Sequence, residues 1–179
     1  MRPLKANEIE LRIGSVGKNG VSVLCYKDAR VDRQMLDEEF GRMNWQDKYR
    51  RDQKGILFCS IGVYDELKGE WIWKEDCGVE SNTEKEKGEA SDAFKRAGFR
   101  WGIGIELYNS PNIRIPVPTE EVSKGRYQMK NRWELFGMYV SRVVTEDNAI
   151  KEMDIVQNDI IIWSTNKKKE GLRVKEDTK

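Results

Sequence analysis

Three basic side chains, Lys95, Arg96 and Arg100, fall within two helical turns of the segment SDAFKRAGFRWGIG, residues 91–104. The small and apolar residues around them predict a helix, so these cations either meet solvent or bind an anion. Asp92 precedes Arg96 by four residues, which permits a weak ion pair along the helix. Arg96 and Arg100, however, are like charges one turn apart, and the phosphates of a nucleic acid would neutralise them. Both interpretations stay open at this point.

A second group of basic residues alternates with aromatic ones. Arg30 and Arg33 belong to the polar face of a predicted helix, and the segment after it interleaves cations with Trp45 and Tyr49. Cations that follow a backbone, together with rings that stack on bases, suit single-stranded nucleic acid. Charge on an edge strand also protects it against aggregation, and this structural role is the alternative. The cations of the segment are Lys48, Arg50, Arg51 and Lys54.

Trp71 and Trp73 stand two residues apart in a predicted strand. This spacing places both rings on the same face of a sheet. Because large aromatic side chains dominate cores, the expected location is the hydrophobic core, and a surface that stacks on nucleic-acid bases is the alternative.

Four acidic residues surround a predicted turn and loosely resemble the metal site of a nuclease. They are Asp65, Glu70, Glu75 and Asp76. The Asp…Glu-x-Lys spacing of such sites is absent, because Lys74 follows Glu70 by four positions, and we expect no catalytic metal. The chain has no histidine, the commonest general base, and no GxGxxG motif. We therefore expect a binding protein, not an enzyme, with no metal and no cofactor.

The charge of the whole chain is nearly balanced. Of its 179 residues 35% are charged, but the formal net charge is only +1, so an anion site must arise from local segregation of charge. Cys25, Cys59 and Cys77 are widely spaced in apolar segments, which predicts reduced thiols packed as small hydrophobic groups. No apolar leader and no membrane-spanning stretch is visible, which predicts a soluble, cytoplasmic protein.

Hydrophobic periodicity predicts an α+β protein whose core has the order helix, three antiparallel strands, helix. The first helix ends at Gly41; the second begins at a capping box formed by Thr83 and Glu86 and ends at Gly102. The elements before the second helix are a strand over 20–26, a helix over 28–40, and strands over 45–51, 56–65 and 70–79.

The C-terminal part of the chain is more polar. Residues 109–131 are predicted as an extended, proline-containing connector, and residues 166–179 as a charged, disordered tail. Residues 1–165 would then form one domain. Its extra strands are predicted over 133–144, 150–156 and 159–165.

Two stretches occur in order on either side of two predicted strands: CYKDARVDRQMLDEEFGRMNWQDKY and CGVESNTEKEKGEASDAFKRAGFRWGIGIELY. Together they resemble the Rad fifty-two family of single-strand annealing proteins, most of all its short bacteriophage (Sak-type) members. The resemblance covers residues 24–108 and is most specific over residues 91–104. It implies a β-β-β-α core with an additional helix, assembling into an oligomeric ring or helical arc. It also implies a basic groove that binds single-stranded DNA, and annealing of complementary strands without nucleotide hydrolysis.

The same resemblance implies roles for individual residues. Lys95 and Arg96 match the lysine–arginine pair that contacts the DNA backbone, and Arg100 lies near a further basic position. Arg30 falls within one residue of a groove arginine of the first helix, and Val79 matches an apolar residue that lines the groove.

The sequence departs from the family at two places. The loop after Val79 is shorter than in eukaryotic members, so Lys85 and Lys87 are placed at the groove by their position alone. Ile105 stands where the phage pattern has a basic residue, which puts one contact in doubt.

The resemblance implies a homo-oligomeric, ATP-independent protein of homologous recombination and DNA repair, located in the bacterial cytoplasm if a phage encodes it. Its partners would be single-stranded DNA and further copies of itself, with phage or host recombination proteins as additional candidates. Two alternatives stay open: a single-stranded DNA-binding or replication accessory protein that does not anneal, and a metal-dependent nuclease.

Overall fold

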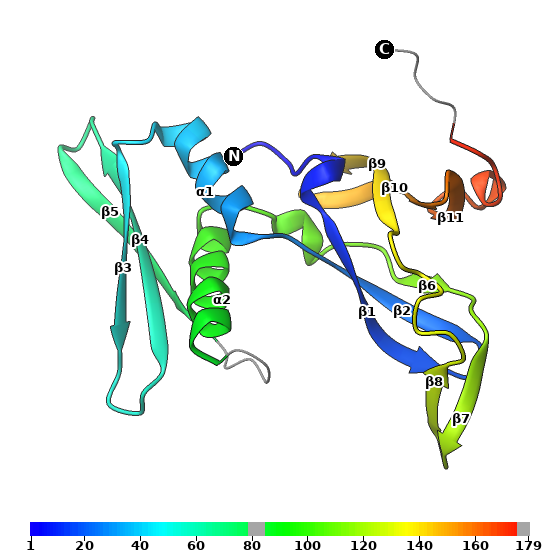
Figure 1. The fold of residues 1–179 in the computed structure, drawn as a ribbon. Coiled ribbons are helices and arrows are strands. Elements are labelled where there is room, and N and C mark those ends of the chain that lie inside the picture. Colours follow the sequence, from blue (N-terminus) through cyan, green and yellow to red (C-terminus); the bar gives the residue numbers. More distant parts are fainter. Residues whose placement is uncertain (79–84, 175–179) are drawn as a thin grey trace. The chain divides into compact units, whose positions relative to one another are not determined.

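The computed structural model describes residues 1–78 and 85–174, with only the backbone of residues 85–87 (Figure 1). The chain is α+β, and its sheets are antiparallel in the part that the structure describes. It divides into two compact units, which are described separately. Unit 1 comprises Met1–Pro3 and Asp28–Ile105, and unit 2 comprises Leu4–Lys27 and Glu106–Lys179. No helix among the described residues is long and apolar enough to cross a membrane.

Unit 1 has the predicted order of helix, three strands and helix. The elements are α1 (Ala29–Phe40), β3 (Trp45–Arg51), β4 (Leu57–Asp65), β5 (Glu70–Cys77) and α2 (Lys85–Arg100). The strands form a sheet in the order β3-β4-β5, and α2 packs against β4 and β5 (Figure 1). The predicted helix over 28–40 and the three predicted strands are therefore confirmed to within a few residues.

The ends of α1 show why its limits could be predicted. The side chain of Asp28 accepts a hydrogen bond from the backbone N–H of Arg30 at 2.7 Å, which caps the first turn. Gly41 ends the helix with φ of 83°, a conformation that glycine adopts without strain. The predicted capping box at Thr83 lies outside the described residues.

The core of unit 1 lies between the sheet and α2. Alternate residues of β4 are buried on the side of the helix, as the period of two requires. Two glycines permit the close packing that the small residues of α2 predict. A Cβ on Gly78 would lie 2.4 Å from the backbone oxygen of Glu89, and a Cβ on Gly98 would lie 2.5 Å from a carboxylate oxygen of the fully buried Asp32. The buried side chains are Cys59, Ile61 and Val63 of β4 and Ala93, Phe94 and Ala97 of α2.

Unit 2 begins with a sheet that the sequence analysis recognised only in part. Its order is β1-β2-β6, with β1 (Glu10–Gly17), β2 (Gly20–Tyr26) and β6 (Ile113–Ile115), and the short helix η1 (Ala6–Glu8) precedes it. Strand β2 was predicted and is confirmed, whereas β1 was not predicted. The prediction of an extended connector over 109–131 is also wrong in part, because the segment contains β6. The alternation Ile-Arg-Ile in this strand places both isoleucines in the core, opposite Val21 and Val23 of β2.

A hairpin follows within the same supposed connector. It consists of β7 (Thr119–Ser123) and β8 (Arg126–Met129), which pair with each other, and β8 lies close to β1 (Figure 1). Within residues 1–78 and 85–174 no other strand pairs with this hairpin, and most of its side chains are exposed.

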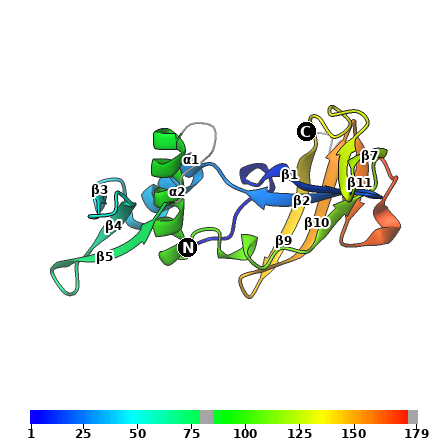
Figure 2. The same ribbon diagram turned by 90° about the horizontal axis from the view of Figure 1, so that it is seen from below.

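The last sheet of unit 2 has the order β11-β10-β9, formed by β9 (Tyr139–Glu146), β10 (Ala149–Gln157) and β11 (Ile160–Ser164) (Figure 2). Both connections are two-residue turns, Asp147-Asn148 and Asn158-Asp159, in which all four residues have positive φ. The predicted strands over 150–156 and 159–165 are confirmed. The predicted strand over 133–144 is wrong at its start: residues 131–137 form turns, and Gly137 with φ of 76° precedes the strand.

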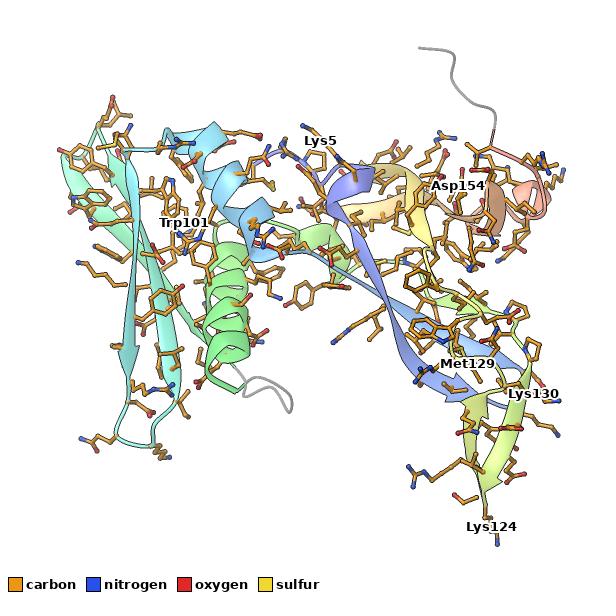
Figure 3. The ribbon with its side chains drawn as sticks, viewed as in Figure 1. Lys5, Trp101, Lys124, Met129, Lys130 and Asp154 are labelled. Carbon is orange, nitrogen blue, oxygen red and sulfur yellow. The ribbon has the colours of Figure 1, made fainter. Side chains whose placement is uncertain are left out.

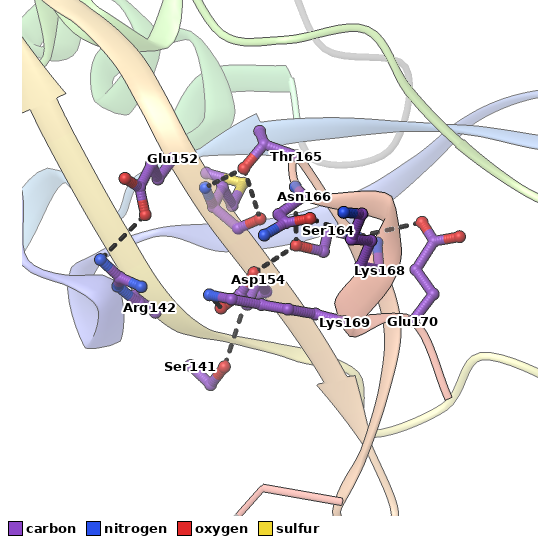
Figure 4. Close-up of polar contacts among 11 residues, drawn as sticks. Ser141, Arg142, Glu152, Asp154, Ser164, Thr165, Asn166, Lys168, Lys169 and Glu170 are labelled. Carbon is purple, nitrogen blue, oxygen red and sulfur yellow. Dashed lines mark hydrogen bonds and ion pairs between the residues drawn. The ribbon is translucent and has the colours of Figure 1, made fainter. Parts of the chain in front are cut away.

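Part of the segment predicted as a disordered tail is ordered. Residues Lys167–Lys169 form the short helix η3, and the backbone N–H of Gly171 donates to the carbonyl of Ile161 at 2.8 Å. The Lys169 ammonium lies 2.9 Å from a carboxylate oxygen of Asp154 on β10, whose other oxygen accepts from the hydroxyl of the buried Ser164 at 2.5 Å (Figure 4). The charge of this segment is therefore used for an internal ion pair. Residues 175–179 lie outside the described part of the chain.

Candidate nucleic-acid interface

Two arginines of α2 converge on one carboxylate of β5. Asp76 lies 3.2 Å from Arg96 Nη2 through one oxygen and 3.1 Å from Arg100 Nε through the other. Burial by itself would raise the pKa of Asp76, but the backbone N–H of Cys77 and the two guanidinium groups hold it below its usual value. The like charges of Arg96 and Arg100 are therefore held side by side by a partner that is far away in the sequence.

An open cleft of about 850 Å³ lies beside this cluster. The Lys74 ammonium donates to the carbonyl of Arg100 at 3.0 Å and sits 4.2 Å from the centre of the Trp101 ring. Because β5 is an edge strand of the sheet, the cleft borders a strand with one side free of sheet partners in the described chain. Its lining residues are Trp73, Lys74, Glu75, Asp76, Phe99 and Arg100. We call this the α2–β5 cleft.

Lys95 does not share the position of Arg96. Successive residues of an α-helix point about 100° apart around its axis, and only Arg96 reaches Asp76. Lys95 is half-buried, and no carboxylate lies within ion-pair distance of it among the residues that the structure describes. Of the predicted lysine–arginine pair, only Arg96 contacts a residue that lines the cleft, Asp76, to which Arg100 also binds.

The face of the sheet opposite α2 is aromatic. Trp71 and Trp73 are 37% and 36% exposed, with ring centres 6.1 Å apart, and Tyr64 packs edge-on against Trp71. The expected core location of the two tryptophans is therefore wrong. Trp73 lies against Gly62, where a Cβ would come within 2.8 Å of the indole ring. Hydrophobicity alone predicts the wrong face here, because the aromatic side of β5 faces away from α2. The side that faces the helix carries Glu70, Ile72, Lys74 and Asp76.

Two predicted cations border the aromatic face. The Lys48 ammonium sits 4.1 Å from the centre of the Trp73 ring, and the Arg50 guanidinium sits 4.4 Å from that of Phe58. Arg50 also bonds to Glu75, and this hydrogen bond and one from Ser60 lower the pKa of the Glu75 carboxyl.

The remaining predicted cations have mostly structural contacts. Arg33 lies 3.2 Å from Asp47 and 4.3 Å from the ring centre of Phe94. Arg51 binds Glu89 of α2 at 2.8 Å, and this hydrogen bond lowers the pKa of the buried Glu89. These two arginines connect β3 to α1 and α2.

Other predicted positions are solvated or not described. The side chain of Arg30 is 94% exposed, with Asp28 at 3.8 Å, and Lys54 is exposed in the turn after β3. Val79 lies outside the described residues, as does the side chain of Lys85. Ile105 opens the short helix η2 (Ile105–Leu107) and is half-buried.

The acidic residues around the β4–β5 turn do not form a metal site. Glu75 and Asp76 are neighbours in β5 and so point to opposite faces, where each binds arginine. No group of three acidic or cysteine side chains that could hold a metal ion occurs within residues 1–78 and 85–174.

The three cysteines have no disulfide partner. Burial raises the pKa of Cys25 to about 11 and that of Cys59 to about 12. This agrees with the predicted role of the cysteines as small, reduced hydrophobic groups.

The sequence analysis missed Lys74 and Phe99 as lining residues of the cleft. A signal exists for both residues, because Lys74 occupies the helix-facing register of β5 and Phe99 follows Arg96 by three residues on α2. Comparison of the chain with protein-family models, with curated proteins and with solved structures returned no match.

Proposed function

We propose that this chain binds single-stranded DNA and anneals complementary strands without hydrolysing a nucleotide. The α2–β5 cleft is the observation that carries the proposal. Arg100 and Lys74 in the cleft, with Arg96 on the neighbouring Asp76, offer cations to phosphates, and Phe99 offers a ring to a base. The exposed ring of Trp73 lies on the opposite face of the same edge strand. Cations and stacking surfaces side by side are the features that bind a single strand without sequence preference.

The resemblance to the Rad fifty-two family supports the annealing activity and the assembly into a ring or arc. The segment with the most specific likeness, residues 91–104, contains both arginines of the cleft. In this proposal, a row of subunits extends the cleft into a continuous groove. The strand is held extended along it, and base pairing with a second strand supplies the sequence specificity.

An annealing assay tests this function. Two complementary oligonucleotides with a donor and an acceptor dye are mixed with and without the protein, and the rate of energy transfer is measured. We expect the protein to accelerate pairing without ATP. Binding without acceleration would instead favour a single-stranded DNA-binding protein, and cleavage that requires Mg²⁺ or Mn²⁺ would favour a nuclease.

Substitutions locate the binding site. Replacement of Arg96 and Arg100 by alanine should lower affinity for a labelled oligothymidine about tenfold or more and reduce the salt dependence of binding, because fewer counterions are released. Lys95→Ala should have a smaller effect, since Lys95 lies outside the cleft. Replacement of Arg42, an exposed arginine that pairs with Asp37 and has no predicted role in the groove, is the matched control. Equal affinities for all variants would contradict the assignment of the cleft.

A further inference from the structure

A loop of unit 2 displays two aromatic side chains at the surface. We call residues 130–136 the aromatic–basic loop; it joins β8 to β9. Trp133 is 58% exposed and Phe136 is 73% exposed, and their rings meet edge-to-face with centres 5.5 Å apart. Isolated exposed apolar residues are common, but a contacting pair this exposed is unusual and marks an interaction surface.

A buried side chain and hydrogen bonds fix the conformation of the loop. Leu135, between the two exposed rings, is only 7% exposed. The side-chain amide of Gln157 on β10 donates to the carbonyls of Glu134 and Phe136 at 2.7 and 2.9 Å. Asn131 accepts a hydrogen bond from the backbone N–H of Trp133 at 3.0 Å. The rings are therefore positioned by the sheet, in a loop with a defined conformation.

Basic side chains accompany the rings. The Arg132 guanidinium lies 4.9 Å from the centre of the Trp133 ring. Lys130 lies at the base of the β7–β8 hairpin, and Lys124 lies at its tip (Figure 3). Between Lys124 and Phe136 the sequence has four cations and one acid. The cations are Lys124, Arg126, Lys130 and Arg132, and none forms an ion pair within the described part of the chain.

The acids nearest to this surface already have other partners. Glu120 accepts from the amide of Gln128 at 2.6 Å, and Glu121 accepts from the backbone N–H of Gly125 at 2.8 Å. These donors are neutral, so both carboxylates keep their charge, and with Glu134 the hairpin and loop (residues 119–136) carry three acids against four cations. None of the four cations is held in an ion pair among the described residues, so each is available to a phosphate.

We infer that the aromatic–basic loop is a second contact site for single-stranded nucleic acid, with bases stacked on Trp133 and Phe136 and phosphates bound by Lys130 and Arg132. The inference rests on the proposed function and extends it to unit 2. An arginine over an aromatic ring has the planar surface to continue a stack with a base. A membrane contact fits this surface less well. An interfacial membrane helix buries a broad apolar face, but the loop exposes only two rings, surrounded by cations and other polar groups.

The test compares the full-length chain with three variants for binding to a fluorescein-labelled oligothymidine. Trp133→Ala combined with Phe136→Ala should weaken binding about tenfold, because stacking contributes per base. Its salt dependence should not change, since no cation is lost. Trp133→Phe, which keeps a ring, should retain most of the affinity. Tyr139→Ala, an exposed aromatic outside the loop, is the matched control and should bind like the parent.

The outcomes distinguish the assignment of the loop as a binding site from the proposed annealing function. If the parent anneals and the double variant binds as tightly as the parent, the loop assignment is overturned and the annealing function stands. If the parent binds but does not anneal, while the double variant loses affinity, the loop assignment stands and the annealing function fails. Absence of any binding by the parent overturns both. Loss of binding to vesicles of anionic lipid, with oligonucleotide binding unchanged, assigns the loop to a membrane and overturns the inference.

Discussion

The arginines of the unit 1 sheet and α2 and the cations of the β7–β8 hairpin and aromatic–basic loop in unit 2 are used in opposite ways. In unit 1 the arginines of the strands and of α2 bind carboxylates, as Arg96 and Arg100 bind Asp76 and Arg51 binds Glu89. In unit 2 the cations of the β7–β8 hairpin and the aromatic–basic loop form no ion pair within the described residues. A paired arginine is fixed in position but contributes little net charge. An unpaired one is free to move and contributes its full charge to an approaching polyanion.

The largest expected difference between the units is in stability. Asp154→Ala in unit 2 leaves the buried Ser164 without its carboxylate partner and Lys169 without its ion pair, and should lower the free energy of unfolding by about 2–3 kcal/mol. Asp76→Ala in unit 1 should lower the free energy of unfolding by less than half of that amount, because water can hydrate the partly exposed Arg96 and Arg100 once the carboxylate is removed. Thermal unfolding measures both.

Ser141→Ala is the control for this experiment, because its hydroxyl makes only a long hydrogen bond, 3.3 Å, to the backbone of Asp154 (Figure 4). Equal losses for Asp154→Ala and Asp76→Ala would show that the two carboxylates are equivalent and would remove the contrast between the units.

The second expected difference is in the salt dependence of DNA binding. Replacement of Lys130 and Arg132 by alanine should reduce the slope of log affinity against log salt by about 1.4, since each phosphate contact of a single strand contributes about 0.7. Replacement of Arg33 and Arg50, which bind Asp47 and Glu75, should reduce the slope much less. Titration of a labelled oligonucleotide at several salt concentrations gives both slopes. A larger change for the paired arginines would contradict the comparison.

A third difference should appear in acid. The pKa values of Glu75, Asp76 and Glu89 in unit 1 are lowered from ordinary values of 4.5, 3.8 and 4.5. A carboxyl with a lowered pKa binds a proton more weakly in the folded state than in the unfolded state. Its contribution to the free energy of unfolding is therefore complete above its ordinary pKa, and it is lost as the pH falls through its pKa in the folded state. With Asp37, unit 1 has four carboxyls of lowered pKa, whereas Glu170 is the one such carboxyl among the described residues of unit 2. Unit 1 should therefore lose protection first as the pH falls below about 4.5.

Hydrogen exchange resolved by peptide, corrected for the intrinsic rate at each pH, measures this loss. Peptides of β4 and α2 should lose protection at a higher pH than peptides of β10. Simultaneous loss in both units would show that acid unfolds the chain as a whole.

The smallest expected effect concerns the thiols. With pKa values of about 12 and 11, Cys59 in unit 1 and Cys25 in unit 2 should react with a thiol reagent at pH 8 far more slowly in the native protein than in urea. Cys59 is fully buried and should react more slowly than the partly exposed Cys25. Mass spectrometry of labelled peptides gives the two rates. Rapid labelling of Cys59 would show that unit 1 opens locally.

Local signals explain which elements could be predicted. Helix α1 has a side-chain cap at Asp28 and a glycine end at Gly41, and β2 and β4 have clear alternation or apolar runs. Strand β1 also alternates, with Leu11 and Ile13 partly buried, but Gly14 and Gly17 weakened the pattern.

Long-range contacts explain what could not be predicted at the candidate site. The sequence suggests Asp92 as a partner of Arg96 but gives no sign of Asp76, twenty residues away, which binds both Arg96 and Arg100. The face occupied by Trp73 depends on Gly62 in the adjacent strand, and only the register of β4 and β5 shows this contact.

Gln157 holds the backbone of the aromatic–basic loop, and this affects how the surface can evolve. The contacts that fix the loop involve backbone carbonyls and the buried Leu135, and none requires the rings at positions 133 and 136. Substitutions at these two positions can therefore alter what the loop binds at little cost to folding. Selection for ligand preference can therefore act on positions 133 and 136, while the requirements of the fold constrain Gln157 and Leu135.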